Sequence, residues 1–251
     1  MLDNINIEDI KQIALDAGEA IMQIYTKDFS VEYKDDKSPL TEADLKSNEI
    51  ICGRLQELFP DTPIMSEENK QVEYESRKEW EFYWCIDPID GTKEFIKKND
   101  EFTVNIALIH KNTPVLGVVY APAIDEMYSA KSGEGAFKNG AKLPLLTNET
   151  PEEKLSVVAS KSHLSEETQA FIDALDTKVV EQISKGSSLK LCMVAEGVAD
   201  IYPRLAPTME WDTAAADAIV REAGKRSLQF ESEEPILYNK ENLLNPWFVI
   251  K

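Results

Sequence analysis

Two aspartates three residues apart, Asp87 and Asp90, have the spacing that most directly suggests chemistry in this chain. They follow an aromatic and apolar run, residues 82–86, which we predict to be a buried strand. Two carboxylates at one strand end repel each other strongly unless a cation lies between them. Hard oxygen ligands of this kind favour Mg²⁺. The amides of Gly91 and Thr92 follow at the start of a predicted helix, where they can bind phosphate oxygens.

The spacing excludes two other kinds of acidic site. A calcium-binding EF-hand loop that began at Asp87 would need a glutamate at its position 12, where the chain has Lys98. An enzyme that forms an aspartyl-phosphate would need the pattern D-x-D, and the chain has D-x-x-D. A plain structural interpretation stays open, in which Asp90 and Gly91 form a turn and Thr92 caps a helix.

Three further acidic positions could join this site. Glu67 and Glu68 follow a strand-like run, Asp212 begins a predicted helix, and Asp44 lies three residues after Thr41. Each position also has a structural interpretation: a solvated acid pair, a helix N-cap, and a capping box of Thr41 with Asp44. The sequence alone does not bring these positions together in space.

Composition limits the partners that such a site can have. The 251 residues carry 27 Lys and Arg against 46 Asp and Glu, so the net charge is −19 with both His neutral. A chain this acidic repels nucleic-acid backbones and anionic lipids at long range. A phosphorylated ligand must therefore be held by metal ions or by a few local cations. The hydrophobic fraction of 43% is enough for a buried core and excludes a disordered chain.

The cysteines and the apolar runs indicate in which cellular compartment the protein is expected. Cys52, Cys85 and Cys192 are odd in number and far apart, which favours packing roles in a reducing environment over a disulfide framework. The start of the chain has no basic stretch followed by an apolar run, and no apolar run approaches the roughly 18 residues of a membrane span. We therefore expect a cytoplasmic protein with no transmembrane segment.

The elements that must position these residues fall into two groups. The first half is predicted to hold a helix at 10–24, a helix from Thr41 to near residue 59, and an antiparallel meander of strands at 82–86, 102–109, 115–120 and 126–130. After a loose stretch at 140–151, strands at 156–159, 179–183 and 200–202 alternate with helices at 166–175, 189–196 and 213–223. This pattern predicts an α+β domain (1–145) that contains Glu67, Asp87 and Asp90, and an α/β domain (146–251) that contains Asp212.

The acidic motifs, in this order, resemble the signatures of the inositol monophosphatase superfamily. The matching segments are Asp36-Lys-Ser-Pro-Leu-Thr41-Glu-Ala-Asp44, Glu67-Glu68, Asp87-Pro-Ile-Asp90-Gly-Thr92 and Trp211-Asp212-x-Ala-Ala. They extend over most of the chain, and the ordered set is highly specific. The resemblance implies a layered αβαβα sandwich of the inositol monophosphatase and fructose-1,6-bisphosphatase type. It also implies a Mg²⁺-dependent, lithium-sensitive phosphatase.

The resemblance further implies roles for individual residues. A first Mg²⁺ would be held by Glu67, Asp87 and the carbonyl of Ile89, and a second by Asp87, Asp90 and Asp212. A third, weaker ion would contact Glu67 and waters bonded to Asp44. Thr92 and Asp44 would orient and deprotonate the attacking water. The substrate phosphate would lie against Glu67, Ile89, Asp90, Gly91, Thr92 and Asp212.

Three further segments resemble the bacterial 3′(2′),5′-bisphosphate nucleotidases of this superfamily: Ser160-Lys-Ser-His163, Ser187-Ser-Leu-Lys190 and Tyr202-Pro-Arg204. The substrate so implied is adenosine 3′,5′-bisphosphate, a by-product of sulfate assimilation, with its sulfated analogue as a second candidate. Lys190 and Arg204 would bind the 5′-phosphate, and Ser187 or Ser188 would donate a hydroxyl hydrogen bond. His163 would contact the ribose or the base.

Two other functions stay open on the sequence alone. The same chemistry could act on an inositol or sugar phosphate, or the chain could be a non-catalytic acidic module that binds cations and a protein partner. Thr92 and Asp44 argue against the module, because a cation store needs neither a hydroxyl nor a water-orienting acid. The sequence sets neither the oligomeric state nor any association with the cytoplasmic face of the inner membrane.

Overall fold

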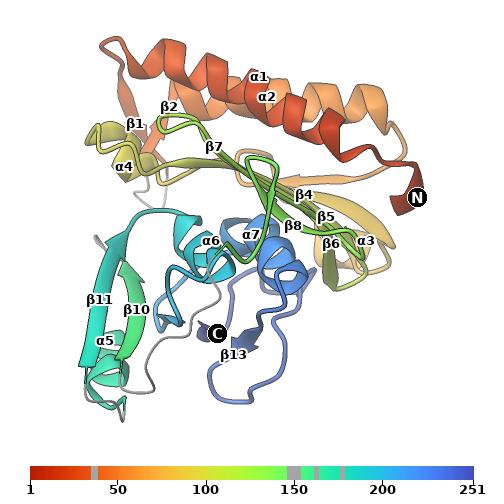
Figure 1. Cartoon of the computed structure of the whole chain (residues 1–251). Helices are drawn as coiled ribbons and strands as arrows, with labels where there is room; N and C mark the ends of the chain where they lie inside the picture. The colour runs from red at the N-terminus through yellow and green to blue at the C-terminus, as the bar shows by residue number, and fades with distance from the viewer. Residues whose placement is uncertain (35–38, 146–153, 161–163, 176–178) are drawn as a thin grey trace.

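Two long helices lie side by side over one face of a seven-stranded sheet (Figure 1). They are α1 (Ile7–Tyr25) and α2 (Glu42–Leu58), preceded by a short 3-10 helix, Leu2–Asn4. Between them, β1 (Val31–Tyr33) and β2 (Pro39–Thr41) form an antiparallel pair. The computed structural model describes residues 1–34, 39–145, 154–160, 164–175 and 179–251.

Local side chains explain where both helices begin. Asn6 caps α1, because its side chain accepts a hydrogen bond from the Glu8 N–H at 3.2 Å. Thr41 and Asp44 form the capping box of α2, in which Asp44 Oδ2 accepts from the Thr41 N–H at 2.8 Å and Thr41 Oγ1 accepts from the Ala43 N–H at 3.2 Å. The buried apolar residues then recur at helical spacing: Ile10, Ile13, Ala14, Ala17 and Ile21 on α1, and Ile51 and Leu55 on α2.

The large sheet has the strand order β3-β4-β5-β6-β7-β8-β9. Its strands are β3 (Ile64–Ser66), β4 (Phe82–Asp90), β5 (Thr103–His110), β6 (Thr113–Ala121), β7 (Glu126–Lys131), β8 (Gly135–Lys138) and β9 (Ala141–Lys142). The short helices α3 (Tyr74–Arg77) and α4 (Thr92–Ile96) precede and follow β4. β3 is parallel to β4, and the strands from β4 to β7 form the predicted antiparallel meander. β8 and β9, which were not predicted, continue it in the same antiparallel pattern. Because β3 and β4 run the same way, their carboxyl ends meet at one edge of the sheet.

Helix α7 (Glu210–Glu222) covers the other face of the sheet, with α6 (Leu189–Glu196) beside it (Figure 1). The approach of α7 to β6 is close at Gly117. A Cβ added there would lie 2.1 Å from the carbonyl oxygen of Ala215 and 2.8 Å from the Cβ of Ala218. The alanine-rich sequence of α7 and the glycine of β6 therefore fit each other.

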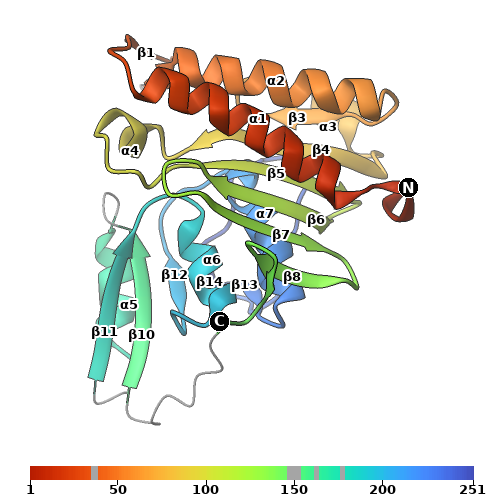
Figure 2. The same cartoon turned by 45° about the horizontal axis from the view of Figure 1, so that its top comes forward.

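Two smaller groups of strands and a helix lie beyond α6 and α7 (Figure 2). β10 (Lys154–Ser160) and β11 (Val179–Lys185) pair in parallel, and β12 (Tyr202–Arg204), β14 (Phe248–Ile250) and β13 (Ser227–Gln229) form an antiparallel sheet in that order. A bridge between Val157 and Ile201 joins the groups, and Ile172 of α5 (Glu166–Asp173) packs against them. The succession of helices, sheet, helices, strands and helix confirms the predicted αβαβα sandwich.

Most predicted elements are present with shifted ends, and two of the shifts affect the acidic motifs. β4 continues to Asp90, further than predicted, because a register shift after Asp87 carries the strand onward. α7 begins at Glu210, so Asp212 lies inside the first turn and is not the N-cap. Half of the predicted boundary at 140–151, residues 146–151, lies outside the described residues, so the division into two domains stays a prediction. Among the described residues, no helix is both long enough and apolar enough to cross a membrane.

The contact between β6 and α7 gives a test of the packing. We expect Gly117→Ala to lower the free energy of unfolding by about 1–3 kcal/mol, because the added methyl overlaps the α7 backbone. Gly53→Ala in α2 is the matched control, since nothing lies within 4 Å of its added Cβ. That change should raise the free energy of unfolding by roughly 0.5–1 kcal/mol. Urea denaturation measures both variants, and equal stability of the two would contradict this packing.

Candidate active site

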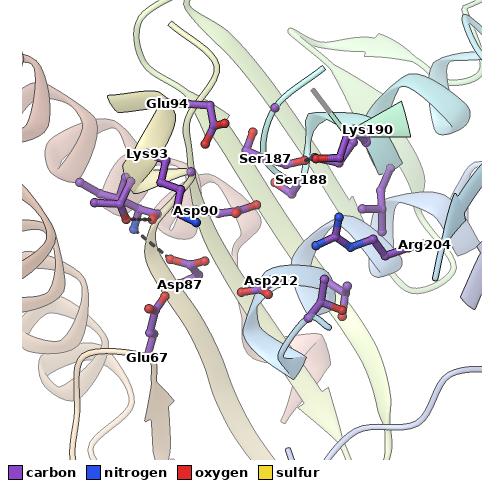
Figure 3. Close-up of a pocket in the computed structure, with 18 of the residues that line it drawn as sticks. Glu67, Asp87, Asp90, Lys93, Glu94, Ser187, Ser188, Lys190, Arg204 and Asp212 are labelled. Carbon is purple, nitrogen blue, oxygen red and sulfur yellow. Dashed lines mark hydrogen bonds between the residues drawn. The ribbon is translucent and has the colours of Figure 1, made fainter. Parts of the chain in front are cut away.

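The end of β4 turns Asp87 and Asp90 toward one cavity, which Ile89 also lines (Figure 3). Asp87 is buried, and its Oδ1 accepts a hydrogen bond from the Ile89 N–H at 3.0 Å. Ser47 of α2 donates from its Oγ to the Pro88 carbonyl at 2.8 Å, which ties the irregular part of the strand to the helix pair. The register shift between Asp87 and Asp90 allows both carboxylates to line the same cavity.

Two other segments bring carboxylates to the same place. Glu67 follows β3, where its N–H donates to a carbonyl of β4 at 3.1 Å. Asp212 lies in the first turn of α7, and its Oδ2 accepts from the Met209 N–H at 2.9 Å. One carboxylate oxygen from each of Glu67, Asp87 and Asp212 lies within 4.8 Å of the other two. Figure 3 shows Asp90 facing the same space, so the structure brings together four acids from three segments that are distant in sequence.

Burial and mutual repulsion raise the pKa of the three aspartates. The pKa of Asp87 lies well above its ordinary value because of burial and then the charges of Glu67, Asp90 and Asp212. Burial raises the pKa of Asp90 to about 6, and burial with the charge of Asp90 raises that of Asp212 to about 8. A divalent cation would relieve this repulsion, and a set of carboxylates with a backbone carbonyl is a donor set that Mg²⁺ accepts.

Thr92 and Asp44 form a fixed pair beside the carboxylates. Thr92 Oγ1 lies 3.1 Å from Asp44 Oδ1 and 3.3 Å from the Ile89 carbonyl oxygen. The other oxygen of Asp44 accepts from the N–H and from Oγ1 of Thr41, at 2.8 Å and 2.6 Å. Asp44 is buried, and burial raises the pKa of its carboxyl. The capping box and the predicted catalytic pair therefore share a residue, because Asp44 caps α2 with one oxygen and holds Thr92 with the other.

Two cations lie across the cavity, whose volume is about 270 Å³. Lys190 of α6 is buried, and its Nζ donates to the Ser187 carbonyl. Burial lowers the pKa of Lys190 to about 8, against the opposing effect of Asp90. Arg204 ends β12 and donates from Nη2 to the Pro207 carbonyl at 3.1 Å. The cavity thus has an acidic wall suited to metal ions and a basic wall suited to a second anion.

The loop before α6 presents two serines to the cavity. Its Gly186 N–H donates to Glu101 Oε2 at 2.9 Å, and Ser187 adopts the left-handed region with φ of 47°. The Ser188 hydroxyl is bonded within the fold, since it lies 2.8 Å from Thr103 Oγ1 and 2.9 Å from Asn105 Oδ1. Of the two serines, Ser187 is therefore better placed to donate to a ligand.

The predicted site residues gather at this cavity. Those that line it are Glu67, Asp87, Ile89, Asp90, Gly91, Thr92, Ser187, Lys190, Arg204 and Asp212. Asp44 meets the cavity through Thr92. His163 lies outside the described residues, so its contact with ribose or base stays a prediction.

Three charged residues at the site were not predicted from the sequence: Lys34, Glu94 and Lys93, which lines the cavity from α4. Lys34 Nζ lies 2.8 Å from Glu67 Oε1 and 2.6 Å from Glu68 Oε1, so the acid pair at the end of β3 is held by a cation. Glu94 of α4 is buried and lines the cavity. Lys34 stands in a polar stretch without a motif, and the only sequence signal for Glu94 is its position two residues after Thr92.

A model described as the inositol monophosphatase family matches residues 2–247 of this sequence. The chain belongs to the inositol monophosphatase family. This membership agrees with the layered fold and with the acidic motifs that meet at the cavity.

Relatives within the inositol monophosphatase family are similar over nearly the whole chain. The chain is 44% identical over 245 residues to the 3′(2′),5′-bisphosphate nucleotidase CysQ of Shigella flexneri, with 96% of this chain and 98% of the relative covered. For the CysQ of Haemophilus influenzae the identity is 39% over 248 residues, with 97% and 91% covered. The crystal structure of CysQ from Bacteroides thetaiotaomicron has a TM-score of 0.85 and 46% identity, covering 95% of this chain and 94% of that chain. The IMPase of Thermotoga maritima has a TM-score of 0.78 and 27% identity, covering 96% and 89%.

The raised pKa values predict how stability depends on pH and Mg²⁺. A raised carboxyl pKa means that the folded state binds the proton more tightly than the unfolded chain does. This tighter proton binding contributes to the free energy of unfolding at acidic pH. The contribution is lost as pH rises through about 6 for Asp90 and about 8 for Asp212. Without metal, the melting temperature should therefore fall between pH 5.5 and pH 8.5. The increase produced by Mg²⁺ should be larger at pH 8.5, because the metal binds ionised carboxylates.

Thermal melts of the metal-free protein with and without Mg²⁺ at both pH values provide the measurement. Asp212→Asn is the control, since it removes one of the repelling charges and should flatten the pH dependence. A Mg²⁺-induced increase that is equal at the two pH values, or larger at pH 5.5, would contradict this electrostatic account.

Proposed function

We propose that this chain is a Mg²⁺-dependent phosphatase that converts adenosine 3′,5′-bisphosphate to AMP and phosphate. The observation that supports this proposal is the arrangement of the cavity, in which clustered carboxylates face Lys190 and Arg204. A substrate with two phosphates needs both walls, one for the phosphate that is cleaved and one for the phosphate that is retained. The relatives named as 3′(2′),5′-bisphosphate nucleotidases support this choice of substrate. The sulfated analogue of the bisphosphate is a second candidate substrate.

The proposed metal ligands belong to the acidic wall. Glu67, Asp87 and the carbonyl of Ile89 would hold one ion, and Asp87, Asp90 and Asp212 a second, with Glu67 contributing to a weaker third. When bound, the ions supply charge neutralisation of the phosphate and a lowered pKa for water. Lys34 pairs with Glu67 at 2.8 Å and so helps to hold the Glu67 side chain at the cavity.

Thr92 and Asp44 would orient the attacking water and take its proton. Because the Thr92 hydroxyl can donate to Asp44 Oδ1 at 3.1 Å, the lone pairs of its oxygen are left to accept from water. Asp44 itself is held by two hydrogen bonds from Thr41, so the pair keeps its geometry before the substrate arrives. Water then displaces the 3′-oxygen directly, and we expect inversion at phosphorus.

Lys190 and Arg204 would bind the 5′-phosphate. Arg204 presents a planar set of donors that suits phosphate, whereas Lys190 provides a single charge. The bond from Arg204 to the Pro207 carbonyl directs its guanidinium, which Figure 3 shows near Asp212. Ser187 would add a hydroxyl donor from the loop before α6.

Removal of the arginine side chain tests the choice of substrate. A hydrogen bond to a charged group contributes about 1.5–3 kcal/mol, so Arg204→Ala should lower kcat/KM for adenosine 3′,5′-bisphosphate at least about tenfold. The same variant should hydrolyse 3′-AMP almost as wild type does, because 3′-AMP has no 5′-phosphate. Phosphate release with Mg²⁺ measures both rates, and Lys190→Ala should show the same pattern more weakly.

Inositol 1-phosphate is the third substrate in this comparison, because a family member specific for inositol phosphates would prefer it. If Arg204→Ala slowed the bisphosphate and 3′-AMP equally, the assignment of the 5′-phosphate would be wrong. A wild-type protein that released phosphate from none of the three substrates would contradict the proposed enzymatic function.

A further inference from the structure

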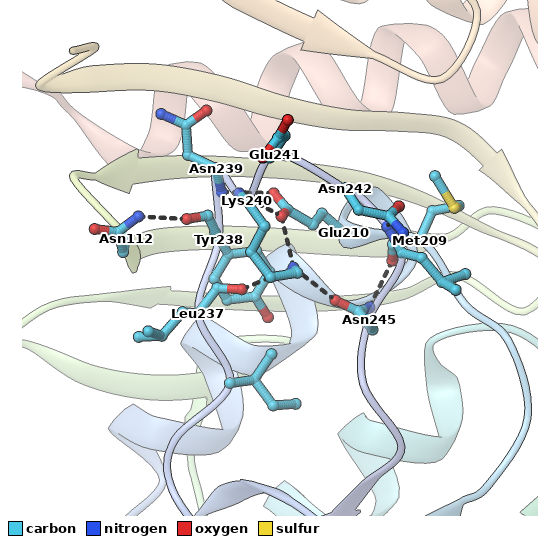
Figure 4. Close-up of polar contacts among 12 residues, drawn as sticks. Asn112, Met209, Glu210, Leu237, Tyr238, Asn239, Lys240, Glu241, Asn242 and Asn245 are labelled. Carbon is cyan, nitrogen blue, oxygen red and sulfur yellow. Dashed lines mark hydrogen bonds and ion pairs between the residues drawn. The ribbon is translucent and has the colours of Figure 1, made fainter. Parts of the chain in front are cut away.

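The start of α7, which carries Asp212, is held by a segment from the far end of the chain (Figure 4). We define this segment, residues 239–245, as the C-terminal clamp. Met209 forms an antiparallel bridge with Leu244, and the Glu210 N–H donates to the Leu243 carbonyl at 3.0 Å. The N–H groups of a first helical turn have no partners within the helix, so here the clamp supplies an acceptor.

Glu210 is the centre of this contact. It is fully buried, and its two carboxylate oxygens accept from the N–H groups of Asn239 at 2.7 Å and Lys240 at 3.0 Å. The Lys240 ammonium also donates to it at 2.6 Å. Figure 4 shows these bonds converging on Glu210 from the clamp. A buried carboxylate with three donors has little freedom to move, and it fixes the helical turn on which Asp212 lies.

Asn245 holds the same turn from the other side. Its side-chain N–H₂ donates to the Met209 carbonyl at 2.8 Å and lies 3.1 Å from Thr213 Oγ1. The Met209 N–H in turn donates to Asp212 Oδ2 at 2.9 Å. Asn245 is therefore bonded to the residue that donates to the Asp212 carboxylate and to the residue that follows Asp212.

The cost of burying the charges of Glu210 and Lys240 suggests that this network has a functional role. An ion pair buried in a protein costs solvation energy, so apolar residues of similar volume often stabilise a fold at least as well. A hydrogen-bonded carboxylate has fixed directions, however, and groups that support a metal ligand commonly change metal affinity when they are mutated. Neither Glu210 nor Asn245 is among the described residues that line the cavity.

We propose that Glu210 and Asn245 are positioning residues that hold Asp212 where it can bind the metal, so that the C-terminal clamp sets the affinity for Mg²⁺. This inference rests on the proposed function, because it takes Asp212 as a ligand. The sequence of the C-terminal clamp does not indicate this role, because none of its carboxylates is among the described residues that line the cavity.

The test compares two buried carboxylates of the same helix. Asp217, five residues beyond Asp212 on α7, is fully buried, accepts a hydrogen bond at 2.9 Å from Tyr238, which precedes the clamp, and pairs with Arg221 at 2.9 Å. Glu210→Gln and Asp217→Asn each remove one buried charge, so that Lys240 and Arg221 respectively lose their carboxylate partner and keep only neutral ones. Both should lower the melting temperature, whereas only Glu210→Gln should alter the position of Asp212.

Isothermal titration of the substrate-free protein with Mg²⁺ is the readout, alongside the melting temperature. We expect Glu210→Gln to raise the Kd for Mg²⁺ about tenfold or more, within the 10- to 100-fold range typical of such supporting groups. Asp217→Asn should keep the wild-type Kd within about twofold. Asn245→Ala should weaken Mg²⁺ binding in the same direction, and it carries the test alone if Glu210→Gln does not fold.

Wild-type affinity in a folded Glu210→Gln or Asn245→Ala protein would overturn the inference and leave the proposed function intact. The same loss of affinity in Asp217→Asn would also overturn it, since the effect would then follow from general destabilisation. If the wild-type protein itself bound no Mg²⁺, the proposed function would fail, and this inference would fail with it.

Discussion

The repulsion among four clustered carboxylates is the constraint on which the rest of the structure depends. Glu67, Asp87 and Asp212 have oxygens within 4.8 Å of one another, and Asp90 lines the same cavity. Charges this close in a buried place are unfavourable without a cation, as the raised pKa values of the aspartates indicate. The fold must therefore hold the acids together, and a bound metal ion must offset their negative charge. The same metal allows a chain with a net charge of −19 to bind a polyanion.

The layered architecture provides this restraint from both faces of the large sheet. The parallel ends of β3 and β4 place Glu67 beside Asp87, and α2 fixes the β4 bulge through Ser47. From the opposite face, α7 brings Asp212 to the same edge, and the close packing at Gly117 fixes its distance from the sheet. Lys190 comes from α6 beside α7, and Arg204 comes from β12 in the layer beyond these helices, so a single cavity collects residues from most of the fold.

Much of this arrangement could be predicted from the sequence, because strand ends, helix starts and acidic motifs have local signals. The meander and the helix that begins after Thr41 are examples. Tertiary effects were not predictable in the same way. The continuation of β4 to Asp90 depends on its pairing with β5, and the burial of Lys190 depends on the layers around α6. The pairing of Glu210 with Lys240 joins residues 30 apart and has no periodicity that a sequence pattern could show.

Anomalous X-ray scattering from crystals soaked in Mn²⁺ tests the central claim most directly, because Mn²⁺ accepts the same oxygen ligands as Mg²⁺. The account predicts a strong peak bounded by the carboxylates of Glu67, Asp87 and Asp212, with further density beside Asp90. Crystals of the Asp87→Asn variant should show this peak strongly reduced. Well-ordered wild-type crystals with no Mn²⁺ peak at these carboxylates, or with peaks only elsewhere on the acidic surface, would contradict the claim that a metal balances this cluster.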